Sequence, residues 1–239
     1  MSDVMKSSEK QSTEQKRALL EKLLKEKAEQ QTKTGSLSYG QRALWFMYQI
    51  DRHSSAYNIM YAAHVRSDVD IPALENAFQK LVVRHPVLRT TYQAVSGLPV
   101  QKVHPHVDAK IVREDARDLD WETLNREMEA EADRPFDLEK GPVFRLRIYE
   151  RRGDGHVFLF TSAHIASDFW SFDLLFDELE ILYRGEIQNT QVELPALPYD
   201  YWGFVQWQEE MLQSEQGQKL WDYWHKQLDG ELPNLDLPT

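Results

Sequence analysis

A histidine and an aspartate at the end of an apolar run have the side-chain types and spacing that acid–base chemistry needs. The segment reads VFLFTSAHIASDFWSFDLLFDELEILY, and in it His164 precedes Asp168 by four residues. An imidazole titrates near neutral pH, so it can take a proton from a nucleophile or hydrogen-bond to it. A lone histidine at a strand end is more often structural, and the local pattern leaves both interpretations open.

Asp168 also has an interpretation that needs no chemistry. The run before His164 has the composition of a buried central strand, and apolar residues at helical spacing restart near Phe169. Ser167 or Asp168 therefore stands at a helix start, where a side-chain oxygen caps N–H groups and the helix dipole favours negative charge. The corner is predicted to join a rigid strand to a packed helix.

Other candidate residues are less well placed for chemistry. His104 and His106 lack a cysteine or carboxylate cluster that would complete a metal site, so both are interpreted as loop histidines. Ser171 has no Gly-x-Ser-x-Gly elbow around it and is interpreted as a first-turn or helix-surface serine. The chain has no cysteine and no glycine-rich phosphate loop, which excludes disulfides, thiol nucleophiles and P-loop chemistry.

The composition is that of a globular protein. The chain has 239 residues, of which 41% are apolar, and this is enough for a substantial core. Its net charge is -11, from 28 basic and 39 acidic residues, which argues against binding nucleic acid or an anionic membrane. Neither a signal peptide nor an apolar run of membrane-spanning length is present, so a cytoplasmic protein is expected.

The elements that must position the corner form an irregular mixture of helix and strand. Strands are predicted at 59–67, 88–93, 100–104, 110–114, 143–150 and 156–164, and helices at 72–85, 121–133, 169–183, 199–213 and 217–228. Gly153, Asp154 and Gly155 predict a hairpin between the last two strands. Without regular βαβ alternation, the order predicts an α+β fold, with helices on a mixed, mostly antiparallel sheet.

Both ends of the chain are predicted to lie outside this folded body. Residues 1–35 are expected to comprise a disordered start and a helix from about Ser12, and a break at 32–36 separates them from the folded body. The helix has a narrow apolar stripe, which is typical of a solvated linker helix, and docking to an upstream partner is the alternative. Residues 186–198 are predicted to form a loop, and residues 229–239 an extended tail.

Taken together, these segments resemble the condensation domains of nonribosomal peptide synthetases. The resemblance rests on LSYGQRALWFMYQI, VVRHPVLRTTY, RPFDLEKGPVFRLRIY, SAHIASDFWS, YDYWGFVQWQ and LWDYWHKQLDGELPNLDLPT, in this order, and covers about Leu37 to Thr239. It implies a chloramphenicol-acetyltransferase-like fold, in which two lobes form a V around a tunnel. Residues 36–228 would be the N-terminal lobe, and 229–239 a crossover tail toward a second lobe.

The resemblance also implies a reaction, in which an acceptor amine attacks a donor thioester and an amide forms. His164 matches the histidine implicated in acyl transfer, and N–H groups at the helix start would stabilise the oxyanion. Asp168 matches an aspartate held by an arginine, which would be Arg84, Arg89 or an arginine of the second lobe. No directly bound cofactor or metal is implied. The expected partners are neighbouring synthetase domains and the donor and acceptor carrier proteins, whose phosphopantetheine arms enter the tunnel.

Two residues depart from the family's His-His-x-x-x-Asp-Gly pattern. Ala163 replaces the first histidine. Because strand side chains alternate, its side chain should face away from that of His164. The replacement is therefore expected to remove internal hydrogen bonds and not a group that takes part in the reaction. Phe169 replaces the glycine and puts a ring where a pantetheine arm should pass. With Trp170 and Ser171 it is expected to line or gate the tunnel.

Three functions follow as alternatives. The domain is an amide-forming catalyst of a peptide or hybrid polyketide–peptide synthetase, a catalytically silent relative that positions carriers, or an ester-forming or epimerising relative. In each case this lobe alone is expected to be inactive. Surface that a second lobe would cover is expected to be exposed and to promote self-association.

Overall fold

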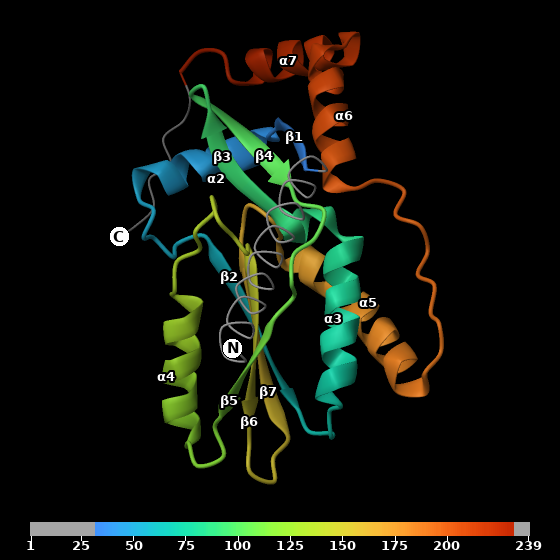
Figure 1. The fold of residues 1–239 in the computed structure, drawn as a ribbon. Coiled ribbons are helices and arrows are strands. Elements are labelled where there is room, and N and C mark those ends of the chain that lie inside the picture. The colour runs from blue at the N-terminus through green and yellow to red at the C-terminus, as the bar shows by residue number, and fades with distance from the viewer. Residues whose placement is uncertain (1–31, 232–239) are drawn as a thin grey trace, which may run out of the picture. The chain divides into compact units, whose positions relative to one another are not determined.

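The computed structural model describes residues 32–231, drawn in colour in Figure 1. These residues fall into two compact units. The first unit ends at Ala196 and the second begins at Leu197. The predicted N-terminal helix and most of the predicted tail lie outside the described residues.

The main sheet of the first unit has four strands in the order β2-β7-β6-β5. These are β2 (Asn58–Val65), β7 (His156–Ala163), β6 (Phe144–Glu150) and β5 (Ile111–Asp115). The first three pair antiparallel, and β5 runs parallel to β6. The predicted mixed sheet is therefore confirmed, with the strand that leads to His164 at its centre.

One face of this sheet carries the helices α3 (Ile71–Arg84) and α5 (Phe169–Gln188), as Figure 1 shows. Phe78 of α3 makes edge contacts with the rings of Phe144, at 5.4 Å, and Phe160, at 6.3 Å. Alternate residues of β6 and β7 thus point toward these helices. Their burial makes this layer the main core of the unit.

The opposite face carries α4 (Trp121–Ala132). Its Leu124 is fully buried against this face. Glu131, at 8% exposure, lies 2.7 Å from Arg145 and 3.0 Å from Arg147 of β6. This face is therefore held by a buried ion network as well as by apolar contact.

A second sheet has three antiparallel strands in the order β1-β4-β3. They are β1 (Lys33–Ser36), β4 (Leu98–Val103) and β3 (Thr90–Val95), and the helix α2 (Tyr39–Ile50) follows β1. The predicted break at 32–36 is therefore wrong, and the expected boundary at residue 35 falls inside β1. The segment KTGS has no apolar alternation, so its strand conformation depends on pairing with β4, which local sequence does not reveal.

Most other element boundaries differ from the prediction by one to three residues. Two differences have clear causes. Pro86–Arg89 forms a short 3-10 helix, which delays β3 to Thr90. The helix predicted to end at Tyr183 continues to Gln188, where Asn189 adopts a left-handed conformation with φ 50° and ends it.

The second unit contains α6 (Tyr201–Gln213) and α7 (Glu215–Gln227). Side-chain caps from Asp200 and Ser214 begin the two helices. Within residues 197–231 only Val205 and Gly217 are buried, so most aromatic side chains of this unit are exposed. Across the described part of the chain, no helix combines the length and apolar character that crossing a membrane requires.

Candidate functional site

The predicted corner forms where β7 ends at Ala163 and α5 begins at Phe169. Backbone bonds fix it on both sides, because the His164 N–H donates to the Tyr57 carbonyl at 2.8 Å and the Ala163 N–H to the Val143 carbonyl at 2.9 Å. Side chains alternate along a strand, so the side chain of His164 points to the face of the sheet that carries α5. The side chain of Ala163 points to the opposite face. The rigid strand therefore presents the imidazole next to the start of α5.

The imidazole of His164 is held in one tautomer. Its Nδ1 lies 3.0 Å from the main-chain carbonyl oxygen of Ser167. A carbonyl only accepts hydrogen bonds, so in the neutral ring Nδ1 carries the proton and Nε2 has a free lone pair. His164 is exposed, and within residues 32–231 its Nε2 has no hydrogen-bond partner. Nε2 is thus available as a base or as an acceptor from an amine.

Asp168 and Ser171 form a reciprocal capping box at the start of α5. Asp168 Oδ1 accepts from the Ser171 N–H at 2.8 Å and from its hydroxyl at 2.7 Å, while the Asp168 N–H donates to Ser171 Oγ at 3.2 Å. These bonds from Ser171 hold the pKa of Asp168 below its ordinary value, and the nearby His164 contributes further. Ser171 therefore uses its hydroxyl in the cap.

The expected partners of Asp168 lie elsewhere. Arg84 Nε is 2.9 Å from Glu178 Oε2, and Arg89 donates to the carbonyl of His104. Among the described residues Asp168 forms no ion pair, so the pairing with Arg84 or Arg89 is wrong. An arginine of a second lobe stays a prediction. Glu178 was not among the predicted site residues, and in the sequence only its place on the buried side of a predicted helix marks it.

Two aromatic side chains stand exposed beside the corner. Phe169 is 62% exposed and Trp170 is 83% exposed. The ring of Phe169 meets the edge of buried Phe172 at 6.2 Å, and Phe172 stacks on Phe176 at 5.7 Å. The Phe169 ring thus contacts Phe172 of the same helix, while most of its surface is exposed.

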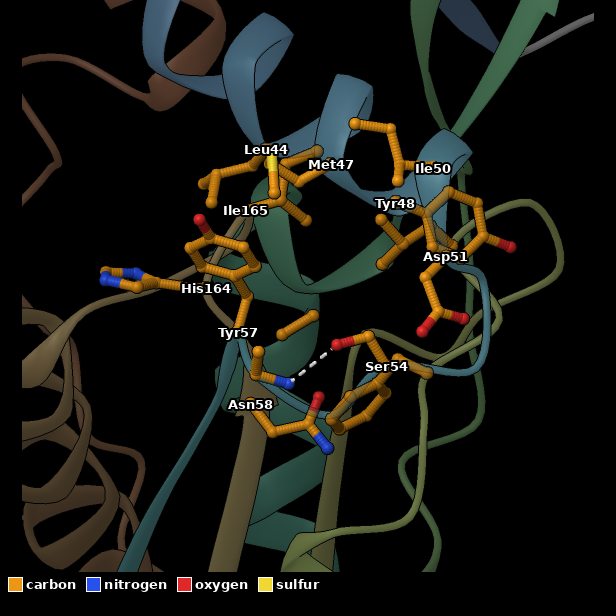
Figure 2. Close-up of a pocket in the computed structure, with 14 residues that line it drawn as sticks. Leu44, Met47, Tyr48, Ile50, Asp51, Ser54, Tyr57, Asn58, His164 and Ile165 are labelled. Carbon is orange, nitrogen blue, oxygen red and sulfur yellow. Dashed lines mark hydrogen bonds between the residues drawn. The ribbon is translucent and has the colours of Figure 1, made fainter.

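An apolar cavity of about 120 Å³ lies on the Ala163 side of the corner. Figure 2 shows the imidazole of His164 pointing away from the labelled apolar side chains. His164 itself contributes to the lining, together with three other polar residues, Asp51, Ser54 and Asn58. The apolar wall consists of Leu44, Met47, Tyr48, Ile50, Ala56, Tyr57, Phe136, Leu138, Ala163 and Ile165. No local pattern marks this cavity, because its walls come from three separate stretches of the chain, 44–58, 136–138 and 163–165.

The two loop histidines have ordinary partners. His104 Nε2 lies 2.8 Å from the Thr91 hydroxyl, and His106 Nε2 lies 2.9 Å from Asp108. Residues 32–231 contain no group of three or more histidine and acidic side chains placed to hold a metal ion.

Comparison with known proteins identifies a family. The family described as Condensation domain matches residues 31–239. Bacitracin synthase 3 of Bacillus licheniformis is 35% identical over 204 residues, which are 85% of this chain and 3% of that protein. Tyrocidine synthase 3 of Brevibacillus parabrevis is 34% identical over 204 residues, again 85% of this chain and 3% of that protein. These relatives are much larger than the chain.

Solved structures show the same fold at lower identity. The starter condensation domain of rhizomide synthetase has a TM-score of 0.75 at 18% identity, covering 82% of this chain and 48% of that one. The X-domain solved in complex with OxyB from teicoplanin biosynthesis has a TM-score of 0.75 at 22% identity, covering 85% and 45%. The chain belongs to the condensation domain family of nonribosomal peptide synthetases, and it spans about half of such a domain.

Proposed function

We propose that this lobe supplies the catalytic histidine for amide formation between two carrier-bound substrates. The observation that carries the proposal is the His164 imidazole, whose Nδ1 is tied to Ser167 and whose Nε2 is exposed. The acceptor amine attacks the donor thioester carbon, and a C–N bond forms while Nε2 takes the amine proton. The C–S bond then breaks, the proton passes to the departing thiolate, and an amide and a free thiol result.

The substrates would arrive on phosphopantetheine arms of donor and acceptor carrier proteins, and neighbouring synthetase domains would be the other partners. The chain itself would bind no cofactor. Asp168 would hold the corner through its cap on α5. Because the Ser171 hydroxyl is engaged in that cap, the proposed gating of the tunnel falls to Phe169 and Trp170.

A catalytically silent domain that positions carriers is the second candidate. The exposed ring of Phe169 favours it, because this ring stands at the first position of α5, where the resembling domains have glycine. An ester-forming or epimerising relative would use the same corner, with a hydroxyl acceptor or a proton shift in place of amine attack.

The test is acyl transfer by the two-lobed parent protein, with an acyl-loaded donor carrier, an aminoacyl acceptor carrier and intact-protein mass spectrometry. His164→Ala should lower the rate about 100-fold or more, since it removes a general base. His106→Ala is the matched control, because that exposed histidine pairs only with Asp108 among the described residues. An acceptor bearing a hydroxyl tests ester formation in the same assay.

The outcomes separate the candidates. Amide formation that depends on His164 supports the proposal. Product only from the hydroxyl acceptor would identify an ester-forming domain. No product from the unaltered protein, with product gained on Phe169→Gly, would identify the silent domain.

A further inference from the structure

Two buried serine hydroxyls form a hydrogen-bonded chain directly behind His164. Ser162 is 1% exposed and Ser167 is 8% exposed. Their Oγ atoms are 2.7 Å apart, and Ser162 Oγ lies 3.1 Å from the Val143 carbonyl oxygen. Ser162 belongs to β7, whereas Ser167 is the last residue before the α5 cap. The chain of hydroxyls therefore ties the end of the turn to the sheet.

The carbonyl oxygens beside Ser162 determine which of the two serine hydroxyls donates to the other. The carbonyl of Val143 can only accept, and so can the Ala163 carbonyl, which lies 3.3 Å from the same oxygen. Ser162 has one hydroxyl proton and must give it to a carbonyl, so it accepts the proton of Ser167. Bonds aligned in one direction inside a protein polarise and strengthen one another.

The carbonyl of Ser167 is the group that orients the His164 ring. It accepts the Nδ1 proton at 3.0 Å. The hydroxyl pair restrains this carbonyl through the Ser167 side chain, and the Asp168–Ser171 cap restrains the next residue along the chain. Two residues earlier in the turn, the Ile165 carbonyl accepts from Gln41 Nε2 and from the Tyr92 hydroxyl, each at 3.3 Å, and the Ala166 N–H donates to the Ala163 carbonyl at 2.9 Å. The hydroxyl pair thus restrains the atom that selects the tautomer.

We propose that Ser162 and Ser167 are positioning residues, which keep His164 in the tautomer with the proton on Nδ1 and the lone pair on Nε2. Neither serine touches the reacting atoms. Without the pair, the carbonyl of Ser167 is less restrained and the ring divides between its two neutral tautomers. The effect on the tautomer stands by itself, and only its effect on rate rests on the proposed function.

The test is nitrogen NMR of the full chain labelled with 15N in its imidazoles, at about pH 8.5, well above the pKa of an ordinary imidazole. Subtraction of the His164→Gln spectrum assigns the two ring nitrogens. The unaltered chain should show a protonated Nδ1 and an unprotonated Nε2. Ser162→Ala and Ser167→Ala should show a mixture of tautomers, and Ser162→Thr, which keeps the hydroxyl, should restore the unaltered spectrum.

Thr161→Val is the matched control. Thr161 is the preceding residue of β7, is 1% exposed, and its hydroxyl has no hydrogen-bond partner within the described structure. This change removes an equally buried hydroxyl from the same strand, on the opposite face of the sheet. The His164 spectrum should not change. An unaltered spectrum in both alanine variants, or a protonated Nε2 in the unaltered chain, would overturn the proposal.

Kinetics of the two-lobed parent then test the consequence for the reaction. In Ser162→Ala, kcat should fall in proportion to the lost fraction of the active tautomer, with the KM for the acceptor unchanged. A fall in kcat with no change in tautomer would assign the serines a purely structural role and refute the proposal. If the parent makes no product, the proposed function fails while the tautomer result still stands.

Discussion

Asp168 stabilises the corner through its hydrogen bonds to Ser171. Its carboxylate takes one of the N–H groups that the first helical turn leaves without an intrahelical partner. It also fixes the chain immediately after Ser167, whose carbonyl orients His164. An aspartate at this position thus has a sufficient structural role within this lobe alone.

Replacing Asp168 with alanine should lower the free energy of unfolding by about 1 kcal/mol, the usual cost of losing such a cap. Asp168→Asn keeps an oxygen that can accept from the Ser171 N–H and should cost much less. Urea denaturation of the 239-residue chain measures both. Equal losses in the two variants would show that the charge, and not the cap, matters.

The cap should also make stability depend on pH. The pKa of Asp168 is lower in the folded chain than its ordinary value, so the ionised form is the one that folding favours. Its contribution is therefore complete above the unfolded pKa, about 3.9, and is lost as the pH falls through the folded pKa. The stability difference between the unaltered chain and Asp168→Asn should shrink below about pH 4, and a constant difference there would contradict this assignment.

At the scale of elements, α5 is held on α3 by a buried carboxylate. Glu178 accepts from Arg84 at 2.9 Å and lies 2.6 Å from His85 Nε2. Burial acts to raise the pKa of Glu178, but the hydrogen bonds from Arg84 and His85 outweigh it and leave the pKa below its ordinary value. This clamp fixes the helix whose first turn borders His164.

Glu178→Ala should lower the free energy of unfolding by about 3 kcal/mol, because it leaves the partners of a buried ion pair uncompensated. Glu180→Ala is the matched control on the same helix. Glu180 is exposed and pairs only with Arg184 within the described residues, so its loss should cost about 0.5 kcal/mol or less. Chemical denaturation of the two variants checks this, and equal costs would mean that α5 is held by apolar packing alone.

The sequence predicts an element well when the residues that determine it are neighbours in the chain. The β7–α5 corner was predictable, because an apolar run, a capping aspartate and helical spacing are adjacent in the chain. β1 was not, since its conformation depends on β4, more than sixty residues later. The same limit applies to the Glu178 clamp, whose partner Arg84 is 94 residues away. Contacts between residues far apart in the chain leave no pattern in the local sequence, so they could not be predicted from it.

At the scale of the whole molecule, both units expose large apolar side chains. In the first unit, Phe46 and Ile50 of α2 are 63% and 64% exposed. In the second unit, Trp221 of α7 is 67% exposed. Exposed apolar surface of this kind favours association between copies, while the net charge of -11 opposes it.

The isolated chain should therefore self-associate, and more strongly as salt increases. Raising the ionic strength from about 0.01 M to about 0.15 M shortens the screening length from about 30 Å to about 8 Å, which weakens the charge repulsion but leaves apolar attraction intact. Sedimentation velocity should show a weight-average coefficient that rises with protein concentration and with salt. Phe46→Ser should reduce this rise, whereas Gln49→Ser, on the same exposed side of α2, should not. A single species that is independent of both variables would show that the exposed aromatic surface does not drive association.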